Sequence, residues 1–415
     1  MSNIKKRLGP KLAILKISDI LTLAYLPAAA IYACWLRYKK RDIWLVCERK
    51  DEARDNGFAF FKYCMEGQKK VACYYAIDKT AEDYEKVKPY AGNVIPFGSF
   101  RHWAYYLACQ ANISSQKNNG PNTLCGFLFR KLNLMNNKIF FLQHGTIIND
   151  CPFMHYRSTK FRLFCCGAWP EYLYVKSQYG YPEGHVAYVG GQCRHDLLHG
   201  GTPNSGRFVL VMPTWRDWLF PKDPRMLEFE GTDKFEESNY FRHWAEVINH
   251  ERLTEIAECN HITFIFYPHP GMQRYVHLFQ RACRSSRVII ADKGSYQLPE
   301  LVKGARALVT DYSSIFFDFI YMKKPVVFYQ FDEDTYRAHQ YPEGYFSYKE
   351  NPFSKWGNDI NSLLGHIQDM VEEGFSVGSQ YEKAHREYFP IYDANNSKRT
   401  FEEIYKRVRR KRGSQ

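Results

Sequence analysis

The sequence predicts an α/β protein made of two Rossmann-like halves in tandem. At 415 residues, the chain is long for one hydrophobic core and suits two domains of ordinary size. Short apolar runs alternate with stretches of helical length, which is typical of strands buried on both faces of a parallel sheet. A cluster of glycine, proline and serine at residues 200–206 separates two such series and is the expected interdomain linker.

The first series predicts an N-terminal Rossmann-like domain over residues 42–199. Its expected strands are residues 43–47, 71–77, 93–96, 139–142 and 163–166. The second series predicts a C-terminal Rossmann-like domain over residues 207–395, with strands at residues 208–212, 262–267, 288–291, 307–310 and 325–329. Helical patterns lie between these strands, as expected for parallel sheets with crossover helices.

The two ends of the chain are basic. In residues 1–41, lysines and arginines flank an uncharged run at residues 20–36. This run has 17 residues with Pro27 near its middle, at the short limit of the roughly 17 to 25 that span a bilayer. We therefore expect a helical membrane-associating arm that lies in the interface, or alternatively an amphipathic arm packed on the first domain. Residues 396–415 form a basic tail that is expected to reach phosphates or lipid head groups, or to be a solvated terminus.

Charge narrows the class of partner. The 57 lysines and arginines exceed the 44 aspartates and glutamates, and the net charge of +13 favours anionic partners such as phosphate-bearing substrates or an acidic membrane face. Nucleic acid is not expected as a partner, because the positive charge concentrates at the termini and no recognised nucleic-acid-binding module is present.

The cysteines, the N-terminal pattern and the carboxylates indicate which cellular compartment and which cofactors to expect. The twelve cysteines are scattered without a CxxC pair or a Cys/His ligand spacing, so we expect reduced core residues. No cleavable signal peptide pattern precedes the domains, which favours a cytoplasmic body. No carboxylate cluster resembles a magnesium site, so no cofactor and no obligatory protein-bound metal are expected.

The strongest local signal is the turn Thr310-Asp311-Tyr312-Ser313-Ser314, which joins an expected strand to an apolar helical pattern. Free backbone amides at a helix start attract anions, and the two serines can add donors without bulk, so a diphosphate fits this turn. Ordinary capping of the helix by Asp311 or a serine is the alternative.

Two histidines follow expected strands. His144, with Gly145 and Thr146 after it, comes at the end of the run at residues 139–142 and is a candidate general base. His269 lies between Pro268 and Pro270, which fix the backbone and restrict the direction of the imidazole. A hydrogen-bonded structural role is the alternative for each histidine by itself.

Two arginines add candidates. Arg216 follows the run at residues 208–212 and could clamp phosphate oxygens with its planar fork, or form a surface charge pattern with Asp217. Arg194 and Asp196 follow Gly190-Gly191, and we expect them to pair with each other and fix that loop, or to belong to a domain-closing loop.

The ordered set of these motifs resembles the CDP-glycerol glycerophosphotransferase family over roughly residues 42–395. The matching motifs are Asp55-Asn56-Gly57, His144-Gly145-Thr146, Gly191 with Arg194 and Asp196, Pro213-Thr214-Trp215-Arg216, His269-Pro270, Thr310-Asp311-Tyr312-Ser313-Ser314 and Lys324-Pro325-Val326-Val327-Phe328-Tyr329. The sequence departs from the family pattern at Ile147 and Ile148 after Thr146, and at Cys193 and His195 beside Arg194.

The resemblance implies a GT-B architecture, in which two Rossmann-like domains face a cleft and the second holds the nucleotide. It implies transfer of glycerol phosphate, or a related alditol phosphate, from a CDP-linked donor to a hydroxyl of a lipid-linked or polysaccharide acceptor at the inner face of the cell membrane. His144 would be the base, and His269 would bind or protonate the pyrophosphate.

The resemblance also assigns the donor phosphates to Arg216, Thr310, Asp311, Ser313 and Ser314. Gly145, Thr146, Arg194 and Asp196 would be supporting residues. Two other interpretations stay open at this point. One is a GT-B glycosyltransferase that uses a nucleotide-sugar, and the other is a binding protein without catalysis.

Overall fold

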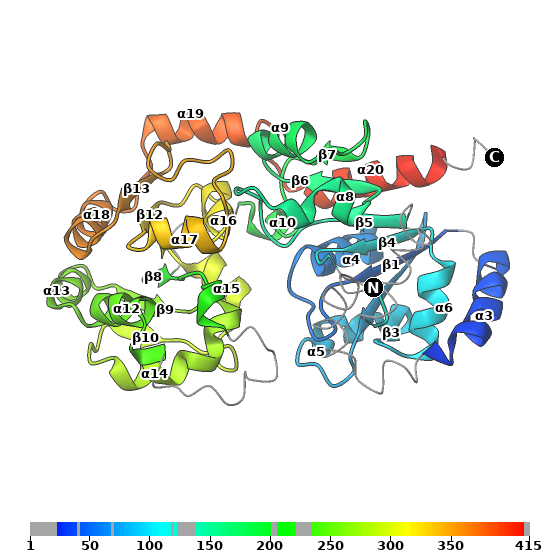
Figure 1. The fold of residues 1–415 in the computed structure, drawn as a ribbon, viewed down its shortest axis with the longest axis horizontal. Helices are drawn as coiled ribbons and strands as arrows, with labels where there is room; N and C mark the ends of the chain where they lie inside the picture. The colour runs from blue at the N-terminus through cyan, green and yellow to red at the C-terminus, as the bar shows by residue number, and fades with distance from the viewer. Residues whose placement is uncertain are drawn as a thin grey trace, which may run out of the picture. The chain divides into compact units, whose positions relative to one another are not determined.

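The computed structural model describes residues 23–39, 42–67, 70–117, 120–122, 138–200, 206–220 and 235–410. The chain divides into two compact units (Figure 1). Unit 1 comprises Met1–Thr146, Pro152–Leu197 and Ile391–Gln415, and unit 2 comprises Ile147–Cys151 and Leu198–Pro390. Most of the expected linker, residues 201–205, lies outside the described residues.

Unit 1 contains a seven-stranded, entirely parallel sheet with the order β3-β2-β1-β4-β5-β6-β7. The strands are β1 (Ile43–Cys47), β2 (Ala72–Ile77), β3 (Val94–Pro96), β4 (Ala111–Ser114), β5 (Ile139–Phe141), β6 (Leu163–Cys166) and β7 (Val186–Tyr188). All five predicted strands are confirmed. The sequence analysis missed β4, which is half polar, and β7, which lies at the edge of the sheet.

The helices of unit 1 follow the Rossmann pattern of crossovers. They are α3 (Leu26–Lys39), α4 (Asn56–Gly67), α5 (Tyr84–Val87), α6 (Phe100–Ala108), α8 (Tyr156–Thr159), α9 (Trp169–Gln178), α10 (His195–Leu198) and α20 (Asn396–Arg410), with short 3-10 turns η1 (Lys88–Asn93) and η3 (Pro152–Met154). Trp44 of β1 stacks on Phe60 of α4 and lies tilted against Phe401 of α20, with ring centroids 6.2 Å and 4.9 Å away. The core therefore joins both ends of the sequence.

Unit 2 contains a six-stranded parallel sheet with the order β10-β9-β8-β11-β12-β13. The strands are β8 (Phe208–Val211), β9 (Thr263–Phe266), β10 (Val288–Ile290), β11 (Ala307–Thr310), β12 (Val326–Tyr329) and β13 (Ser354–Gly357). The five predicted strands are confirmed here too, and β13 was missed. Its sequence, Ser-Lys-Trp-Gly, lacks an apolar run because it lies at the edge of the sheet.

The helices of unit 2 alternate with its strands. They are α12 (Asn239–Asn249), α13 (Glu251–Cys259), α14 (Val276–Ala282), α15 (Leu298–Gly304), α16 (Phe316–Tyr321), α17 (Glu333–His339), α18 (Ile360–Glu372) and α19 (Ser379–Tyr388), with 3-10 turns η4 (Asp217–Leu219) and η6 (Pro270–Tyr275). Trp244 of α12 is fully buried against Phe266 of β9 and Tyr329 of β12. Both sheets have the strand order of a Rossmann fold, in which the switch point lies between the first and fourth strands.

The C-terminal segment differs from the basic tail expected for residues 396–415. Residues Asn396–Arg410 form α20, which packs beside α4 in unit 1 with Phe401 and Ile404 buried (Figure 1). The basic residues of this helix lie mostly on its other side, and residues 411–415 lie outside the described residues. The helix is amphipathic, and the need to bury its apolar face explains why it folds onto the first domain.

The N-terminal arm is described from residue 23 onward. Helix α3 packs beside α6 (Figure 1), with Ala29, Ala33 and Leu36 buried. Within the described residues, no helix combines the length and the hydropathy needed to cross a bilayer.

Candidate functional site

The carboxyl ends of three neighbouring strands of unit 2 bring the donor-site candidates together. Strands β9, β8 and β11 are adjacent, so the segments that follow them, with His269, Thr214 and Ser313, emerge at the same edge of the sheet. Hydrogen bonds join these segments: the His269 amide donates to the Pro213 carbonyl at 3.2 Å, and the Thr310 hydroxyl donates to the Met212 carbonyl at 2.7 Å. Ligands of Rossmann-type sheets bind at this edge.

The turn after β11 presents only part of the predicted phosphate site. Ser313 and Ser314 are half-buried, whereas Thr310 and Asp311 are completely buried. Asp311 does not cap α16, whose first turn follows Ile315. Instead, its Oδ1 accepts hydrogen bonds from the amides of Thr214 and Tyr312, both at 2.7 Å. Thr310 and Asp311 therefore hold the turn together, and the two serines are the accessible residues.

Arg216 lies in a buried ion network. Its Nε and Nη2 contact both carboxylate oxygens of Asp332 at 2.7 and 3.0 Å, and Nη2 lies 2.8 Å from Asp311 Oδ2. Its Nη1 donates to the Thr214 carbonyl at 2.9 Å. Burial acts to lower the pKa of Arg216, but Asp311 and Asp332 raise it above its ordinary value, so the side chain keeps its charge. This guanidinium contacts protein carboxylates, and Asp217 is not its ion-pair partner.

The environment of the network is aromatic. The Arg216 guanidinium lies 5.0 Å from the ring centroid of Tyr312, 5.2 Å from that of Tyr240 and 5.4 Å from that of Tyr336. Burial raises the pKa of Asp311, while Arg216 and the two backbone amides oppose that rise. Arg216, enclosed by rings and two carboxylates, therefore stabilises the turn at Thr310–Ser314 through Asp311.

The ring of His269 has a defined tautomer. Its Nδ1 accepts a hydrogen bond from the Gly271 amide at 3.0 Å. An amide can only donate, so Nδ1 carries no proton and the ring proton is on Nε2. His269 is therefore built to donate a hydrogen bond from Nε2 while it is neutral.

The ring of His144 in unit 1 has the opposite tautomer. It follows β5, and its Nδ1 lies 3.2 Å from the Ser115 carbonyl, which follows the neighbouring strand β4. A carbonyl can only accept, so Nδ1 carries the proton and Nε2 keeps its lone pair. The ring is accessible at the surface, and the surrounding protein lowers the pKa of His144 chiefly by desolvation, while Asp55 acts to raise it. A histidine in this state suits a general base.

The expected pair of Arg194 and Asp196 is wrong. Arg194 Nη1 lies 2.8 Å from Asp55 Oδ1 and donates to the His144 carbonyl at 3.1 Å. Asp196 accepts hydrogen bonds from the amides of Asn396 and Ser397, at 2.7 and 2.8 Å. It therefore caps the amino end of α20, and only Arg194 belongs to the surroundings of His144.

The loop before Arg194 needs glycine for close packing. Gly190 has a φ of 88°, and a Cβ at this position would lie 2.5 Å from Arg399 Nη2. Arg399 itself donates from Nε to the Val189 carbonyl at 2.7 Å. This glycine thus lets α20 approach the end of β7.

A carboxylate fills the amino end of α4, the first helix after a strand in unit 1. Glu48 follows β1, and its carboxylate accepts from the amides of Arg54 at 3.0 Å, Asp55 at 3.1 Å and Phe58 at 2.7 Å. Burial raises the pKa of Glu48 to about 8, and Asp55 adds to the rise. In Rossmann folds this position binds a nucleotide phosphate, so in unit 1 a protein side chain already occupies it.

Sequence reasoning missed several polar residues at these edges. Glu48 follows β1 directly and Asp332 follows β12 by three residues, so the rule that identified the histidines could have identified both. Ser115 follows β4, a strand that was not predicted, so the same rule could not have identified it. Asn56 and Gln192 are buried and contact the His144 loop from other segments. Their role depends on contacts between residues more than 45 positions apart in sequence, which no local pattern reveals.

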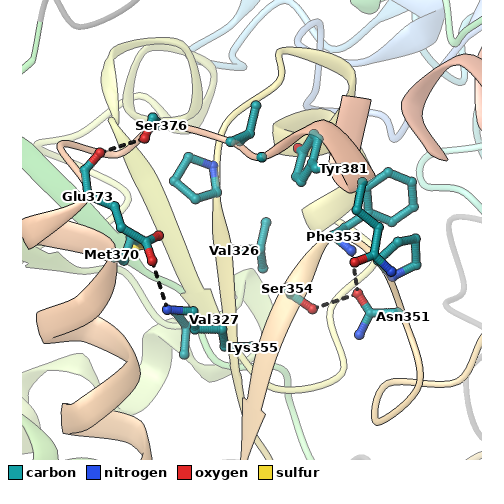
Figure 2. A pocket seen from close by; sticks show the side chains of 15 residues that line it. Val326, Val327, Asn351, Phe353, Ser354, Lys355, Met370, Glu373, Ser376 and Tyr381 are labelled. Carbon is teal, nitrogen blue, oxygen red and sulfur yellow. Dashed lines mark hydrogen bonds and ion pairs between the residues drawn. The ribbon is translucent and has the colours of Figure 1, made fainter. Parts of the chain in front are cut away.

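A separate cavity of about 300 Å³ lies in unit 2 (Figure 2). Its lining includes Val326 at the start of β12, Ser354 at the start of β13, and Phe353, Met370 and Tyr381. It opens at the amino ends of these strands, opposite to the edge that carries Ser313 and His269. The cavity is therefore not part of the candidate donor site.

The described cysteines and the possible metal ligands form neither disulfides nor metal-ion clusters. Eight of the cysteines placed there are buried and none forms a disulfide, as expected for reduced core residues. Across the described ranges, no three His, Cys, Asp or Glu side chains are grouped so as to hold a metal ion.

These features define the chain as a tandem Rossmann-type α/β protein with histidine-bearing sites at the carboxyl edges of its two sheets. It belongs to the CDP-glycerol:poly(glycerophosphate) glycerophosphotransferase family, whose sequence model matches residues 178–406. The matched region contains His269, Arg216 and the turn at Thr310–Ser314, whereas His144 lies outside it.

Known relatives agree with the family. The chain is 31% identical over 386 residues to the minor teichoic acid biosynthesis protein GgaB of Bacillus subtilis (strain 168), covering 91% of this chain and 41% of that protein. It is 35% identical over 87 residues to the teichoic acid glycerol-phosphate primase of the same strain, covering 21% of each. The chain thus spans less than half the length of the curated relatives it matches.

A solved structure supports the fold. The wall teichoic acid polymerase TagF superposes with a TM-score of 0.60 at 15% identity, covering 95% of this chain and 96% of that chain. At this identity the likeness concerns the fold alone.

Proposed function

We propose that this chain transfers glycerol phosphate from CDP-glycerol to a hydroxyl of a lipid-linked or polymeric acceptor, with release of CMP, in teichoic acid synthesis. The family membership supports this reaction, as does a solved structure of a TagF variant soaked with CDPG. The observation that carries the mechanism is the opposite tautomers of His144 and His269.

The two tautomers fit the two ends of a phosphoryl transfer. His144 takes the proton of the acceptor hydroxyl on Nε2, and the oxygen attacks the phosphorus that bears glycerol. His269 donates a hydrogen bond from Nε2 to the pyrophosphate, where negative charge develops as CMP departs. Because Nδ1 of His269 already accepts a hydrogen bond, binding the pyrophosphate suits this ring better than protonating it.

The position of Glu48 supports a donor site in unit 2. Since its carboxylate occupies the amino end of α4, a diphosphate at that turn of unit 1 would meet a carboxyl group in place of free amides. Ser313 and Ser314 would contact the donor phosphates, and Arg216, Thr310 and Asp311 would hold their turn from below. In a GT-B arrangement, the acceptor side would then belong to unit 1, with Gly145 giving room beside His144 and Thr146 anchoring the loop.

A donor screen tests the reaction. The chain is offered CDP-glycerol, CDP-ribitol and a panel of nucleotide-sugars, each with a synthetic lipid that carries a short glycerol phosphate chain. We expect CMP release with CDP-glycerol that depends on acceptor, because a hydroxyl must attack the phosphorus. Activity with nucleotide-sugars only would favour the glycosyltransferase interpretation and refute the proposal.

We also propose that α3 attaches the protein to the inner face of the cell membrane. Ile31, Trp35 and Tyr38 follow one another at helical spacing and expose 76%, 49% and 84% of their surface. Arg37 and Lys39 lie at the end of the same helix. An apolar stripe with aromatic rings beside basic residues suits a bilayer interface that contains anionic lipid.

Vesicle sedimentation tests the attachment. Trp35→Ser combined with Tyr38→Ser should weaken binding to phosphatidylglycerol and phosphatidylethanolamine vesicles by about tenfold or more, because two exposed aromatic side chains no longer enter the interface. Ile289→Ser is the control, since Ile289 is an exposed apolar residue of unit 2 and should leave binding unchanged. Equal sedimentation of all three proteins would contradict a role for α3.

A further inference from the structure

The backbone directly before His144 is held in an uncommon conformation. Gln143 has a φ of 67°, in the left-handed region that residues other than glycine rarely adopt. The residue is buried, and its side chain donates from Nε2 to the Cys165 carbonyl at 2.5 Å. Such a conformation is strained and persists only where the surrounding structure imposes it. The direction of the His144 side chain therefore depends on what holds this turn.

Asn56 is the residue that ties the turn to its neighbours. Its side chain is fully buried, and its Nδ2 donates to the Gln143 carbonyl at 2.9 Å and to Gln192 Oε1 at 3.0 Å. Its Oδ1 accepts from the Arg194 amide at 3.0 Å. One amide group thus connects the start of α4, the His144 turn and the loop after β7.

The hydrogen-bond partners of Asn56 also bind the backbone and side chains around His144. Gln192 donates from Nε2 to the Thr146 hydroxyl at 3.2 Å, two residues after the histidine. Arg194 donates to the carbonyl of His144 itself while it pairs with Asp55. The other hydrogen bonds of the turn go to the neighbouring strands: His144 Nδ1 lies beside the Ser115 carbonyl after β4, and Gln143 Nε2 donates to the Cys165 carbonyl of β6.

We infer that Asn56 is a positioning residue for the reaction, which locks the strained turn at Gln143 so that His144 Nε2 faces the acceptor hydroxyl. The inference rests on the proposed function, because it assumes that His144 is the base. Because Asn56 is fully buried, its effect should appear in the rate of transfer and not in donor binding.

The test uses a side chain of equal size. Asn56→Asp keeps the oxygen that accepts from Arg194 and replaces the Nδ2 donor with an oxygen that repels the Gln143 carbonyl. We expect kcat to fall about 10- to 100-fold, since misplacement of a catalytic group by an ångström costs about that much. The KM for CDP-glycerol should stay within about twofold of wild type, because the donor site lies in the other unit.

Asn93→Asp is the matched control. Asn93 also donates from Nδ2 to a backbone carbonyl of unit 1, that of Cys73 at 2.7 Å, but it precedes β3 at the amino edge of the sheet. It should lose thermal stability as Asn56→Asp does, with kcat unchanged. Asn56→Ser is the second variant: it removes the Nδ2 donor without placing a carboxylate beside the Gln143 carbonyl, so it should disturb the fold less, and kcat should again fall.

The outcomes separate the inference from the proposed function. Wild-type protein that uses a different donor in the screen would overturn the CDP-glycerol assignment only, and kcat would then be compared with that donor. Wild-type kcat in folded Asn56→Asp, or a loss no larger than in Asn93→Asp, would overturn the positioning role. If Asn56→Asp does not fold, Asn56→Ser decides, and wild-type kcat in that variant overturns the role as well.

Discussion

Replacing Arg216 with alanine is expected to lower the free energy of unfolding by about 3–5 kcal/mol, the cost of removing one partner from a buried ion network. The guanidinium is completely buried and contacts both Asp311 and Asp332. Without the guanidinium, the carboxylates of Asp311 and Asp332 would lie among tyrosine rings with no cation between them. Arg216→Lys should also be destabilising, because an ammonium cannot bind Asp332 through two parallel hydrogen bonds.

Chemical denaturation monitored by fluorescence measures this effect. Arg281→Ala is the control: Arg281 pairs with Glu236 at 2.7 Å on the surface of the same unit, and its loss should cost less than about 1 kcal/mol. If Arg216 were instead a direct ligand of the donor phosphates, Arg216→Ala would unfold like the wild type and raise only the KM for the donor. That result would contradict the placement of Arg216 beneath the site.

Replacing His144 with alanine should reduce kcat by about 10²- to 10⁴-fold, the usual contribution of a general base. The proton on Nδ1 is fixed by the Ser115 carbonyl, so the loss of the ring removes the lone pair that accepts the hydroxyl proton. The fold should be kept, because the ring is accessible and no core packing depends on it.

The pH dependence provides a sharper test of the same role. The base must be unprotonated, so activity should rise with pH through the pKa of His144. Because the protein lowers that pKa, the rise should lie below the ordinary histidine value of about 6.5. No fall attributable to His269 should follow at higher pH, since that ring acts as a neutral donor.

His185→Ala is the matched control for His144. His185 also has Nδ1 beside a backbone carbonyl, that of Phe161 at 3.0 Å, but it precedes β7 at the amino edge of the same sheet. Its replacement should leave kcat and the pH profile unchanged. Wild-type turnover by His144→Ala would show that another group takes the proton.

The apolar runs determined most of the fold. All ten predicted strands are present, because strands of a parallel sheet are covered on both faces and must be apolar along their length. The positions of His144, His269 and the two serines at strand ends followed from the same pattern. Strands β7 and β13 were missed because they lie at sheet edges, where fewer apolar residues are needed, and β4 was missed because half of its buried residues are polar.

Tertiary structure alone decided which polar residues are buried and hold the turns of the candidate sites, and which are accessible. Arg216 and Asp311 are 95 residues apart and become buried partners only when β8 and β11 pair. Arg194 pairs with Asp55 and not with Asp196, its neighbour in sequence. Helix α20 packs on the first domain. Both contacts arise because charge pairing and apolar burial act between segments that are distant in sequence. The sequence by itself determined the strands and the residues at their ends, since local hydropathy encodes both. The tautomers of the histidines, the enclosure of Arg216 and the hold of Asn56 on the His144 turn depended on neighbours that only folding brings together.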